Sequence, residues 1–196
     1  MSLTPLRTAV FLDRDGVILE NRADYIKSLA EAQFIPGAVE ALARLARHDV
    51  LIVIATNQSA IGRGVVSREM VDAINAHVVE RIASAGGRVD GLYLCPHHPQ
   101  DGCSCRKPAP GMLLEAARDM GIDLAASVMI GDGLTDVQAA EAAGVKPMLV
   151  LTGLGAVEAQ RLASAQLNHT VTVPDLPAAI EQLLGESAWF TKTPRP

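Results

Sequence analysis

Two aspartates that stand two residues apart, Asp13 and Asp15, are well suited to chemistry. They follow the apolar run 9–12, which predicts a buried strand. In a strand, residues i and i+2 project to the same side, so the two carboxylates can converge beyond its end. Carboxylates at close range repel each other unless a cation shares the site, and Mg²⁺ prefers oxygen ligands. The pair indicates a site for Mg²⁺ and phosphate; a turn with two solvated aspartates is the alternative for this motif alone.

Polar side chains also follow two other predicted strands. The apolar run 50–55 ends at Thr56 and Asn57, and the run 127–130 ends just before Asp132. Continuous apolar runs fit parallel strands that are covered on both faces, and ligands of such sheets bind beyond the carboxyl ends of the strands. Lys107 lies in a loop that can reach the same edge. Taken singly, these residues could be a helix cap, a surface charge or a turn, but those alternatives do not explain their common position.

The alternation of strands and helices predicts an α/β fold with a doubly wound parallel sheet. We expect strands near 8–12, 50–55, 91–94, 127–130, 147–151 and 170–173. Helices are expected from residue 36, over 67–85, over 110–121, up to 144, near 156–166 and near 176–185. Residues 18–35 form a long irregular stretch, a length typical of functional loops. The chain 1–196 is predicted to be one domain with 95–105 as an inserted loop and 186–196 as a loose tail.

These residues suit the hydrolysis of a phosphate monoester, a reaction that needs positioning and charge neutralisation. Asp13 can attack phosphorus and form an aspartyl phosphate, and Asp15 can protonate the leaving oxygen and then activate water. Thr56 and Asn57 offer hydrogen-bond donors, and Lys107 offers a cation. Two acidic residues complete the candidate site: Asp132 would bind Mg²⁺ with Asp13, and Asp136 would support the metal or orient Lys107.

The three cysteines of the chain fall in one short segment with a histidine. Cys95-x-His97 and Cys103-x-Cys105 together offer three thiolates and one imidazole, the full ligand set of a tetrahedral Zn²⁺ site. Four protein ligands leave no open position, so the zinc is expected to be structural. It would fix the loop that carries Arg106 and Lys107. His98 is the less favoured ligand, and a loop with unpaired thiols is the alternative.

Composition and the length of the apolar runs disfavour nucleic-acid-binding and membrane proteins. A net charge of −5 and an aromatic content of 3% disfavour nucleic-acid binding. Apolar runs are too short for a membrane helix, and a signal peptide is not recognised, so we expect a cytoplasmic protein without a membrane partner. We expect a monomer that acts on a small molecule.

Four motifs in order resemble the haloacid dehalogenase superfamily of phosphatases: Asp13-x-Asp15-Gly16, Thr56, Lys107, and Gly131-Asp132-x-x-x-Asp136. Phe-Leu-Asp-Arg-Asp-Gly, Thr-Asn-Gln-Ser, Cys-Pro-His-His-Pro and Cys-Arg-Lys-Pro further resemble the family of D-glycero-D-manno-heptose 1,7-bisphosphate 7-phosphatases, over about residues 8–185. That resemblance implies a Mg²⁺-dependent enzyme without a large cap domain. It would remove the 7-phosphate of the sugar in ADP-heptose biosynthesis, for lipopolysaccharide or other surface glycans.

The resemblance also implies roles for individual residues. Asp13 would be the nucleophile and Asp15 the proton donor, Thr56 and Lys107 would stabilise the phosphoryl group, and Mg²⁺ would bind Asp13, the Asp15 carbonyl and Asp132. The implied substrate-binding residues are Asn21, Arg22, Ala23, Asp24, Thr56, Asn57, Gln58, Ser59, Arg106 and Lys107. The sequence departs from some members by a shorter spacer between His97 and Cys103 and by Gly133 in place of a lysine.

Three other functions compete with this interpretation. Histidinol-phosphate phosphatase has a similar zinc-bearing domain. A phospho-receiver also uses an aspartate, Mg²⁺ and a lysine, but it would lack an acid at the position of Asp15. A zinc-ribbon nucleic-acid module is disfavoured by the acidic charge and by the single short zinc loop.

Overall fold

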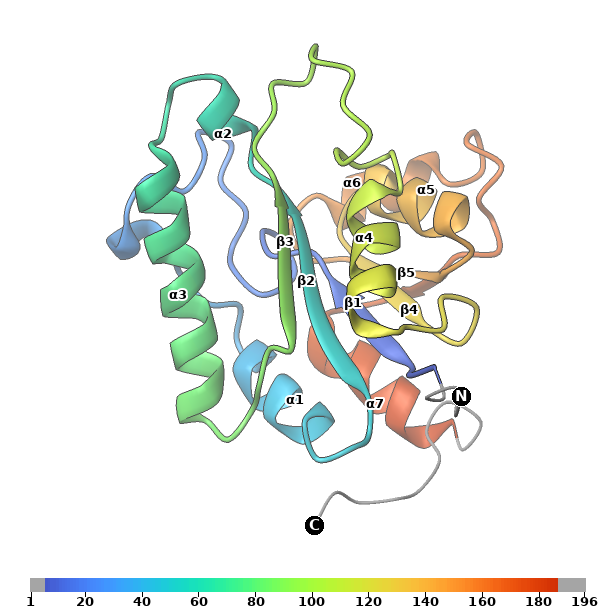
Figure 1. The fold of residues 1–196 in the computed structure, drawn as a ribbon. Coiled ribbons are helices and arrows are strands. Elements are labelled where there is room, and N and C mark those ends of the chain that lie inside the picture. The colour runs from blue at the N-terminus through green and yellow to red at the C-terminus, as the bar shows by residue number, and fades with distance from the viewer. Residues whose placement is uncertain (1–5, 187–196) are drawn as a thin grey trace, which may run out of the picture.

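A computed structural model describes residues 6–186 of the chain. Its centre is a six-stranded parallel sheet with the order β3-β2-β1-β4-β5-β6 (Figure 1). The strands are β1 (Ala9–Leu12), β2 (Leu51–Asn57), β3 (Gly91–Cys95), β4 (Val128–Gly131), β5 (Lys146–Val150) and β6 (Val171–Val173). All paired strands run parallel, which confirms the predicted doubly wound sheet.

The strand order reverses at β1. The chain builds β2 and β3 on one side of β1 and then returns to build β4, β5 and β6 on the other side. Val10 and Leu12 of β1 pair with Val128 and Ile130 of β4. In open α/β sheets the crevice at such a switch point, beyond the carboxyl ends of the strands, is the usual ligand site. Asp13 follows β1 directly and Asp132 follows β4 directly, so both lie at this point.

Helices cover both faces of the sheet. One face packs against α1 (Ala38–Leu45), α3 (Arg68–Ser84) and α7 (Leu176–Gly185), and the other packs against α4 (Gly111–Met120) and α5 (Leu134–Ala143) (Figure 1). Side chains alternate along β1, so that Val10 and Leu12 join the first core while Ala9 and Phe11 join the second. Burial on both faces explains why the central strands are apolar at every position.

Short elements complete the chain. They are α2 (Ser59–Gly62), α6 (Gly155–Glu158) and the 3-10 turns η1 (Leu29–Glu31) and η2 (Ala159–Arg161). The predicted strands and long helices are found to within about two residues, and Ser67 caps α3 by accepting a hydrogen bond from Met70 N (3.2 Å). The helix predicted near 156–166 is wrong as a single element, because α6 and η2 replace it. The start of the predicted tail, Glu186, is described, and residues 187–196 lie outside the described part.

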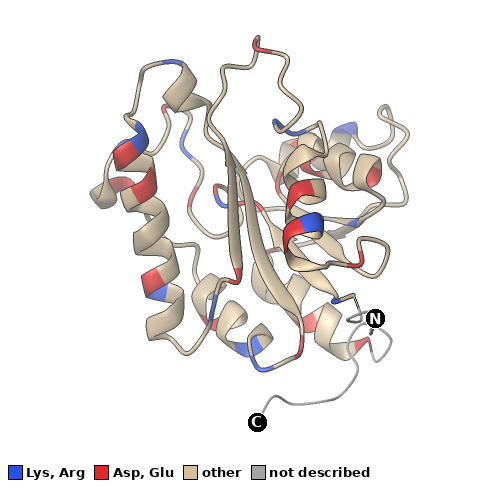
Figure 2. Cartoon of the chain, in the orientation of Figure 1, with Lys and Arg blue, Asp and Glu red and all other residues tan. Residues whose placement is uncertain are grey.

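Charged residues are interspersed along the chain. Acidic and basic residues both occur on α3 and on α4 (Figure 2), as the near-balance of charge in the sequence leads one to expect. Between residues 6 and 186, no helix is long and apolar enough to cross a membrane.

Candidate active site

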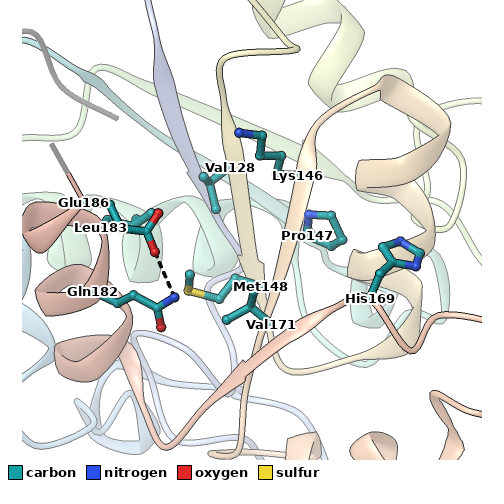
Figure 3. A pocket seen from close by; sticks show the side chains of 9 residues that line it. All are labelled: Val128, Lys146, Pro147, Met148, His169, Val171, Gln182, Leu183 and Glu186. Carbon is teal, nitrogen blue, oxygen red and sulfur yellow. Dashed lines mark hydrogen bonds between the residues drawn. The ribbon is translucent and has the colours of Figure 1, made fainter. Parts of the chain in front are cut away.

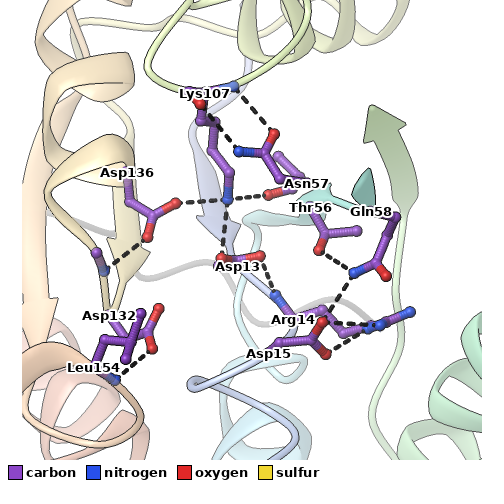
Figure 4. A network of polar contacts seen from close by, with 12 residues as sticks. Asp13, Arg14, Asp15, Thr56, Asn57, Gln58, Lys107, Asp132, Asp136 and Leu154 are labelled. Carbon is purple, nitrogen blue, oxygen red and sulfur yellow. Dashed lines mark hydrogen bonds and ion pairs between the residues drawn. The ribbon is translucent and has the colours of Figure 1, made fainter. Parts of the chain in front are cut away.

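Lys107 lies at the centre of a buried polar network at the carboxyl ends of β1, β2 and β4 (Figure 4). Its side chain is 1% exposed. The Nζ atom lies 2.6 Å from Asp136 Oδ1 and 3.1 Å from Asp13 Oδ2, and it donates to the carbonyl of Ala55 (2.7 Å). Burial alone would lower the pKa of Lys107, but the two carboxylates outweigh it and raise the pKa, so the ammonium stays charged.

Asn57 fixes the backbone of the lysine. Its side-chain amide donates to the Lys107 carbonyl (3.0 Å), and its amide oxygen accepts from Lys107 N (3.1 Å). This pair of bonds joins the end of β2 to the loop before α4. Asn57, which is predicted to offer a hydrogen bond to phosphate, uses its side-chain amide in this structure to hold Lys107 in place.

Three carboxylates converge beside the lysine. Ligand oxygens of Asp13, Asp132 and Asp136 lie within 4.8 Å of one another. Burial raises the pKa of Asp132 to about 8, with further contributions from the charges of Asp13 and Asp136. Burial also raises the pKa of Asp13 to about 6, although Lys107 opposes the shift. One lysine offsets only one of the three negative charges, so the donor set fits a hard divalent cation such as Mg²⁺.

Glycine is required where the β1 loop passes Asp132. Gly16 has φ +85°, and a Cβ atom there would lie 1.9 Å from Asp132 Oδ2. The loop is held in this position because the Thr152 hydroxyl donates to the Gly16 carbonyl (2.6 Å). Leu154 N donates to Asp132 Oδ2 (2.8 Å), which orients the carboxylate from the other side. The Asp-x-Asp-Gly motif therefore brings the backbone close to the candidate metal ligand.

Asp15 is held by residues that follow β1 and β2. Arg14 donates from Nε to Oδ1 (2.8 Å) and from Nη2 to Oδ2 (2.9 Å). Gln58 donates to Oδ2 of the same carboxylate (2.9 Å) and to the Thr56 hydroxyl (3.0 Å). Arg14 and the supporting role of Gln58 were not predicted from the sequence, because both contacts depend on the folded loop.

A cavity of about 300 Å³ opens beside the two catalytic candidates. Its lining residues are Asp13, Asp15, Asn21, Arg22, Tyr25, Ile26, Asn57, Ser59, Arg63, Arg106 and Thr135. Five predicted substrate-binding residues therefore line it: Asn21, Arg22, Asn57, Ser59 and Arg106. Ala23, Asp24, Thr56, Gln58 and Lys107 are not among the lining residues, and Asp24 instead pairs with Arg22 (3.0 Å) and Lys27.

The cysteine cluster has the dimensions of a zinc site. Cys95 Sγ lies 3.6 Å from Cys103 Sγ, Cys105 Sγ lies 3.5 Å from Cys103 Sγ, and His97 Nδ1 lies 3.2 Å from Cys105 Sγ. Tetrahedral Zn²⁺ with bonds of about 2.3 Å to sulfur separates its sulfur ligands by about 3.8 Å, so these four residues could hold a zinc ion. His98 does not belong to the cluster: it accepts a hydrogen bond from Gln100 N (3.2 Å) through Nδ1.

The zinc loop is attached to both neighbouring elements. Gly62 N of α2 donates to the Pro96 carbonyl (2.9 Å), and a Cβ atom at Gly62 would lie 2.4 Å from His98 N. Gly111 N of α4 donates to the Ser104 carbonyl (3.0 Å). The cluster therefore fixes the chain directly before Arg106 and Lys107.

A second cavity, of about 180 Å³, lies at the opposite edge of the sheet (Figure 3). It is lined by the first residues of β4, β5 and β6 and by the end of α7, with His169 and Lys146 at its border. None of the residues in the network around Lys107 lines it.

Comparison with known families agrees with the motifs and geometry. The model described as haloacid dehalogenase-like hydrolase matches residues 6–141, and a HAD-hydrolase-like model matches residues 104–179. The chain belongs to the haloacid dehalogenase-like hydrolase family. Its relatives in this family include the D-glycero-beta-D-manno-heptose-1,7-bisphosphate 7-phosphatase of Bordetella bronchiseptica, which is 43% identical over 91% of this chain and 98% of the relative. That relative confirms the resemblance predicted from the motifs.

Solved structures support the same assignment. The D,D-heptose 1,7-bisphosphate phosphatase from B. bronchiseptica, complexed with magnesium and phosphate, matches with a TM-score of 0.86 and 43% identity, covering 91% of this chain and 99% of that one. The enzyme from Burkholderia thailandensis matches with a TM-score of 0.70 and 34% identity, covering 92% and 100% of the two chains. This haloacid dehalogenase-like hydrolase is therefore a phosphatase by family.

Four residues of the cavity in this hydrolase were missed at the level of sequence. Tyr25 and Ile26 lie in the predicted functional loop 18–35, Thr135 lies inside the Gly131–Asp136 motif, and Arg63 lies in the Gly62-Arg63-Gly64 segment after β2, but none was assigned individually. A basic residue between two glycines is consistent with a loop that approaches an anion, but the pattern is too common to assign alone.

Proposed function

We propose that this protein removes the 7-phosphate of D-glycero-β-D-manno-heptose 1,7-bisphosphate. The observation that carries the proposal is the pair Asp13 and Asp15 at the wall of a cavity that is also lined by Arg22, Arg63 and Arg106. The nucleophile and acid suit one phosphate, and three guanidinium groups suit a second anionic group on the same substrate. The relatives' names specify the β anomer, which we adopt for this chain.

The residues support a two-step transfer. A carboxylate oxygen of Asp13 attacks phosphorus while Asp15 gives its proton to the leaving sugar oxygen, which yields an aspartyl phosphate and the sugar alcohol. Asp15, now ionised, accepts a proton from the water that attacks phosphorus, and this second step releases phosphate and regenerates Asp13. Lys107 holds Asp13 throughout, because its ammonium lies 3.1 Å from Oδ2.

Asp13 and Asp132, with the Asp15 carbonyl, would hold Mg²⁺, and Asp136 would position Lys107 beside them. Bound Mg²⁺ would supply charge neutralisation for the phosphoryl oxygens. The zinc ligands Cys95, His97, Cys103 and Cys105 would have a structural role only, since all four positions of the ion are occupied by protein.

The arginines also favour one of the two closest candidate substrates over the other. Histidinol phosphate carries an ammonium group where heptose bisphosphate carries its second phosphate. Arg106 lines the cavity, and its permanent positive charge favours an anion there and disfavours a cation. We also propose a cytoplasmic monomer that acts in ADP-heptose biosynthesis and binds neither nucleic acid nor membranes; a reducing compartment keeps the thiols available for zinc.

Phosphate release from both heptose bisphosphate anomers and from histidinol phosphate tests the proposal. We expect the β anomer to be preferred over histidinol phosphate by more than about tenfold in kcat/KM, which corresponds to about 1.4 kcal/mol. ³¹P NMR of the product should retain the signal of the 1-phosphate. A tenfold preference for histidinol phosphate would overturn the choice of substrate, and phosphorylation that stops after one equivalent would indicate a receiver.

Arg63→Gln tests the proposed contact to the second phosphate. It should raise KM for the bisphosphate while leaving the hydrolysis of p-nitrophenyl phosphate unchanged, because that ester has no second anionic group. Arg81→Gln on the outer part of α3 is the matched control and should change neither. Equal effects of Arg63→Gln on both esters would contradict the assignment.

A further inference from the structure

Arg14 is fully buried although it carries a permanent charge. Its side chain is 0% exposed and is the largest fully buried side chain among the described residues. Proteins almost never bury arginine without partners, because removal of a charge from water is unfavourable. The partners of Arg14 therefore indicate what the fold gains from this burial.

Both carboxylate oxygens of Asp15 accept hydrogen bonds from the guanidinium group. The Nε–Oδ1 and Nη2–Oδ2 distances are 2.8 and 2.9 Å, the parallel arrangement in which a planar fork fixes the rotation of a carboxylate (Figure 4). The Asp15 side chain is 24% exposed on its other side, where it lines the cavity. Arg14 thus holds the proposed acid from behind and leaves its front open to substrate.

Asn75 holds the third nitrogen of the same guanidinium group. It accepts from Arg14 Nη1 (2.7 Å) and lies inside α3, 61 residues away in the chain and 5% exposed. The Asn75 Nδ2 atom is buried and has no hydrogen-bond partner within the described part of the chain. An unpaired buried amide nitrogen is unfavourable. Among the described residues, the hydrogen bond that Asn75 accepts from Arg14 is therefore the one favourable polar contact of this side chain.

The contacts distinguish the two oxygens of Asp15. Oδ2 accepts from Arg14 Nη2 and from Gln58 Nε2 (2.9 Å each), and these two donors use its two lone pairs. Among the described residues, Oδ1 accepts from Arg14 Nε alone, so one lone pair remains available. We propose that Arg14 and Asn75 are positioning residues, which orient Asp15 so that Oδ1 gives and takes the catalytic proton. The inference rests on the proposed function.

Loss of this orientation has a consequence that depends on the leaving group. A sugar alkoxide needs the proton from Asp15 to leave, and transfer requires an oxygen at hydrogen-bond distance in the correct direction. A p-nitrophenolate leaves without a proton. The value of kcat/KM covers the steps up to loss of the leaving group, so it reports this difference without interference from hydrolysis of the aspartyl phosphate.

The test compares kcat/KM for heptose bisphosphate and for p-nitrophenyl phosphate in two variants. Arg14→Lys keeps the charge but cannot span both oxygens of Asp15. It should lower kcat/KM for the sugar ester by about 100-fold, near the lower end of general acid catalysis, and for the aryl ester by less than about threefold. Asn75→Ala should give the same selectivity with a smaller loss, about tenfold on the sugar ester, because one of three guanidinium contacts is removed.

Ser67→Ala is the matched control. It perturbs α3 at its cap, whereas Asn75→Ala perturbs it in its interior, and Ser67 contacts neither Arg14 nor the cavity. It should lower the melting temperature and leave the ratio of the two kcat/KM values at the wild-type level. Asn75→Ala keeps the test valid if Arg14→Lys does not fold.

The outcomes separate this inference from the proposed function. A ratio unchanged from wild type in either variant overturns the positioning role, as does a shift of the ratio in Ser67→Ala equal to that in Asn75→Ala. A wild-type protein that releases phosphate from neither ester overturns the proposed function, and the positioning role with it.

Discussion

Replacement of Lys107 by methionine tests the electrostatic design of the site. Methionine matches much of the lysine stem but removes the ammonium group that lies 3.1 Å from Asp13 and 2.6 Å from Asp136. Both carboxylates then remain in the interior without their cation. Removal of one partner of a buried ion pair destabilises proteins by about 3–5 kcal/mol. For a chain of this size, that corresponds to a fall in melting temperature of about 6–20 °C.

The loss should depend on pH. The pKa of Asp13 is raised in the folded protein to about 6 from its usual 3.8. Ionisation of this carboxyl therefore lowers the free energy of unfolding, and the loss grows as pH rises from about 4 through 6. Lys107 opposes that shift, and its removal must raise the pKa of Asp13 further and extend the loss to higher pH. The difference in melting temperature between wild type and Lys107→Met should therefore be large at pH 8 and small at pH 5.

Differential scanning calorimetry of metal-free protein at pH 5, 6.5 and 8 measures this dependence. Lys27→Met is the control, because Lys27 pairs with the exposed Asp24 and such surface pairs contribute about 0–1 kcal/mol. A Lys107→Met protein as stable as wild type at pH 8, or a difference independent of pH, would refute the reasoning.

Three further predictions concern the nucleophile and the two metals. Asp13→Asn should lower kcat by at least about 10³-fold in a phosphate-release assay, because an amide is a poor nucleophile; retained turnover would remove Asp13 from that role. Removal of zinc by a chelator, or by Cys103→Ser, should lower the melting temperature by about 5–10 °C and raise KM. Near-zero zinc in protein purified without chelator would contradict a zinc site. In a thermal-shift titration, Mg²⁺ should raise the melting temperature more at pH 8 than at pH 6. The reason is that Asp132, whose pKa is raised to about 8, must lose its proton to bind the ion. Equal shifts at the two pH values would argue against Asp132 as a ligand.

Much of the site follows from sequence because its residues stand directly after strands. Asp13, Thr56, Asn57 and Asp132 each come within two residues of an apolar run, and parallel strands bring their carboxyl ends to one edge. The zinc ligands follow from spacing alone, since Cys-x-His and Cys-x-Cys can close a tetrahedron whatever the surrounding fold. Both predictions rest on local patterns, namely the position of a residue after a strand and the spacing of the zinc ligands.

The parts that sequence did not reveal depend on distant contacts or on short segments. The pairing of Arg14 with Asn75 joins residues 61 positions apart, and an asparagine inside a helix has no pattern of its own. The helix expected near 156–166 ends early, because Leu162 and Leu167 both pack into one cluster across a turn in which Leu167 N donates to the Leu162 carbonyl (2.9 Å). A spacing of five residues does not place two side chains on one helical face.

The charges of the site make metal binding and substrate binding interdependent. Four carboxylates, Asp13, Asp15, Asp132 and Asp136, face two buried cations, Arg14 and Lys107, which leaves two negative charges when all groups are ionised. A phosphate dianion would be repelled by that surplus, and a divalent cation cancels it. Arg22 of the cavity adds little to this balance, because it is already paired with Asp24. The raised pKa values of Asp13 and Asp132 are therefore the expected property of a carboxylate cluster built around a cation, and the same cation prepares the site for an anionic substrate.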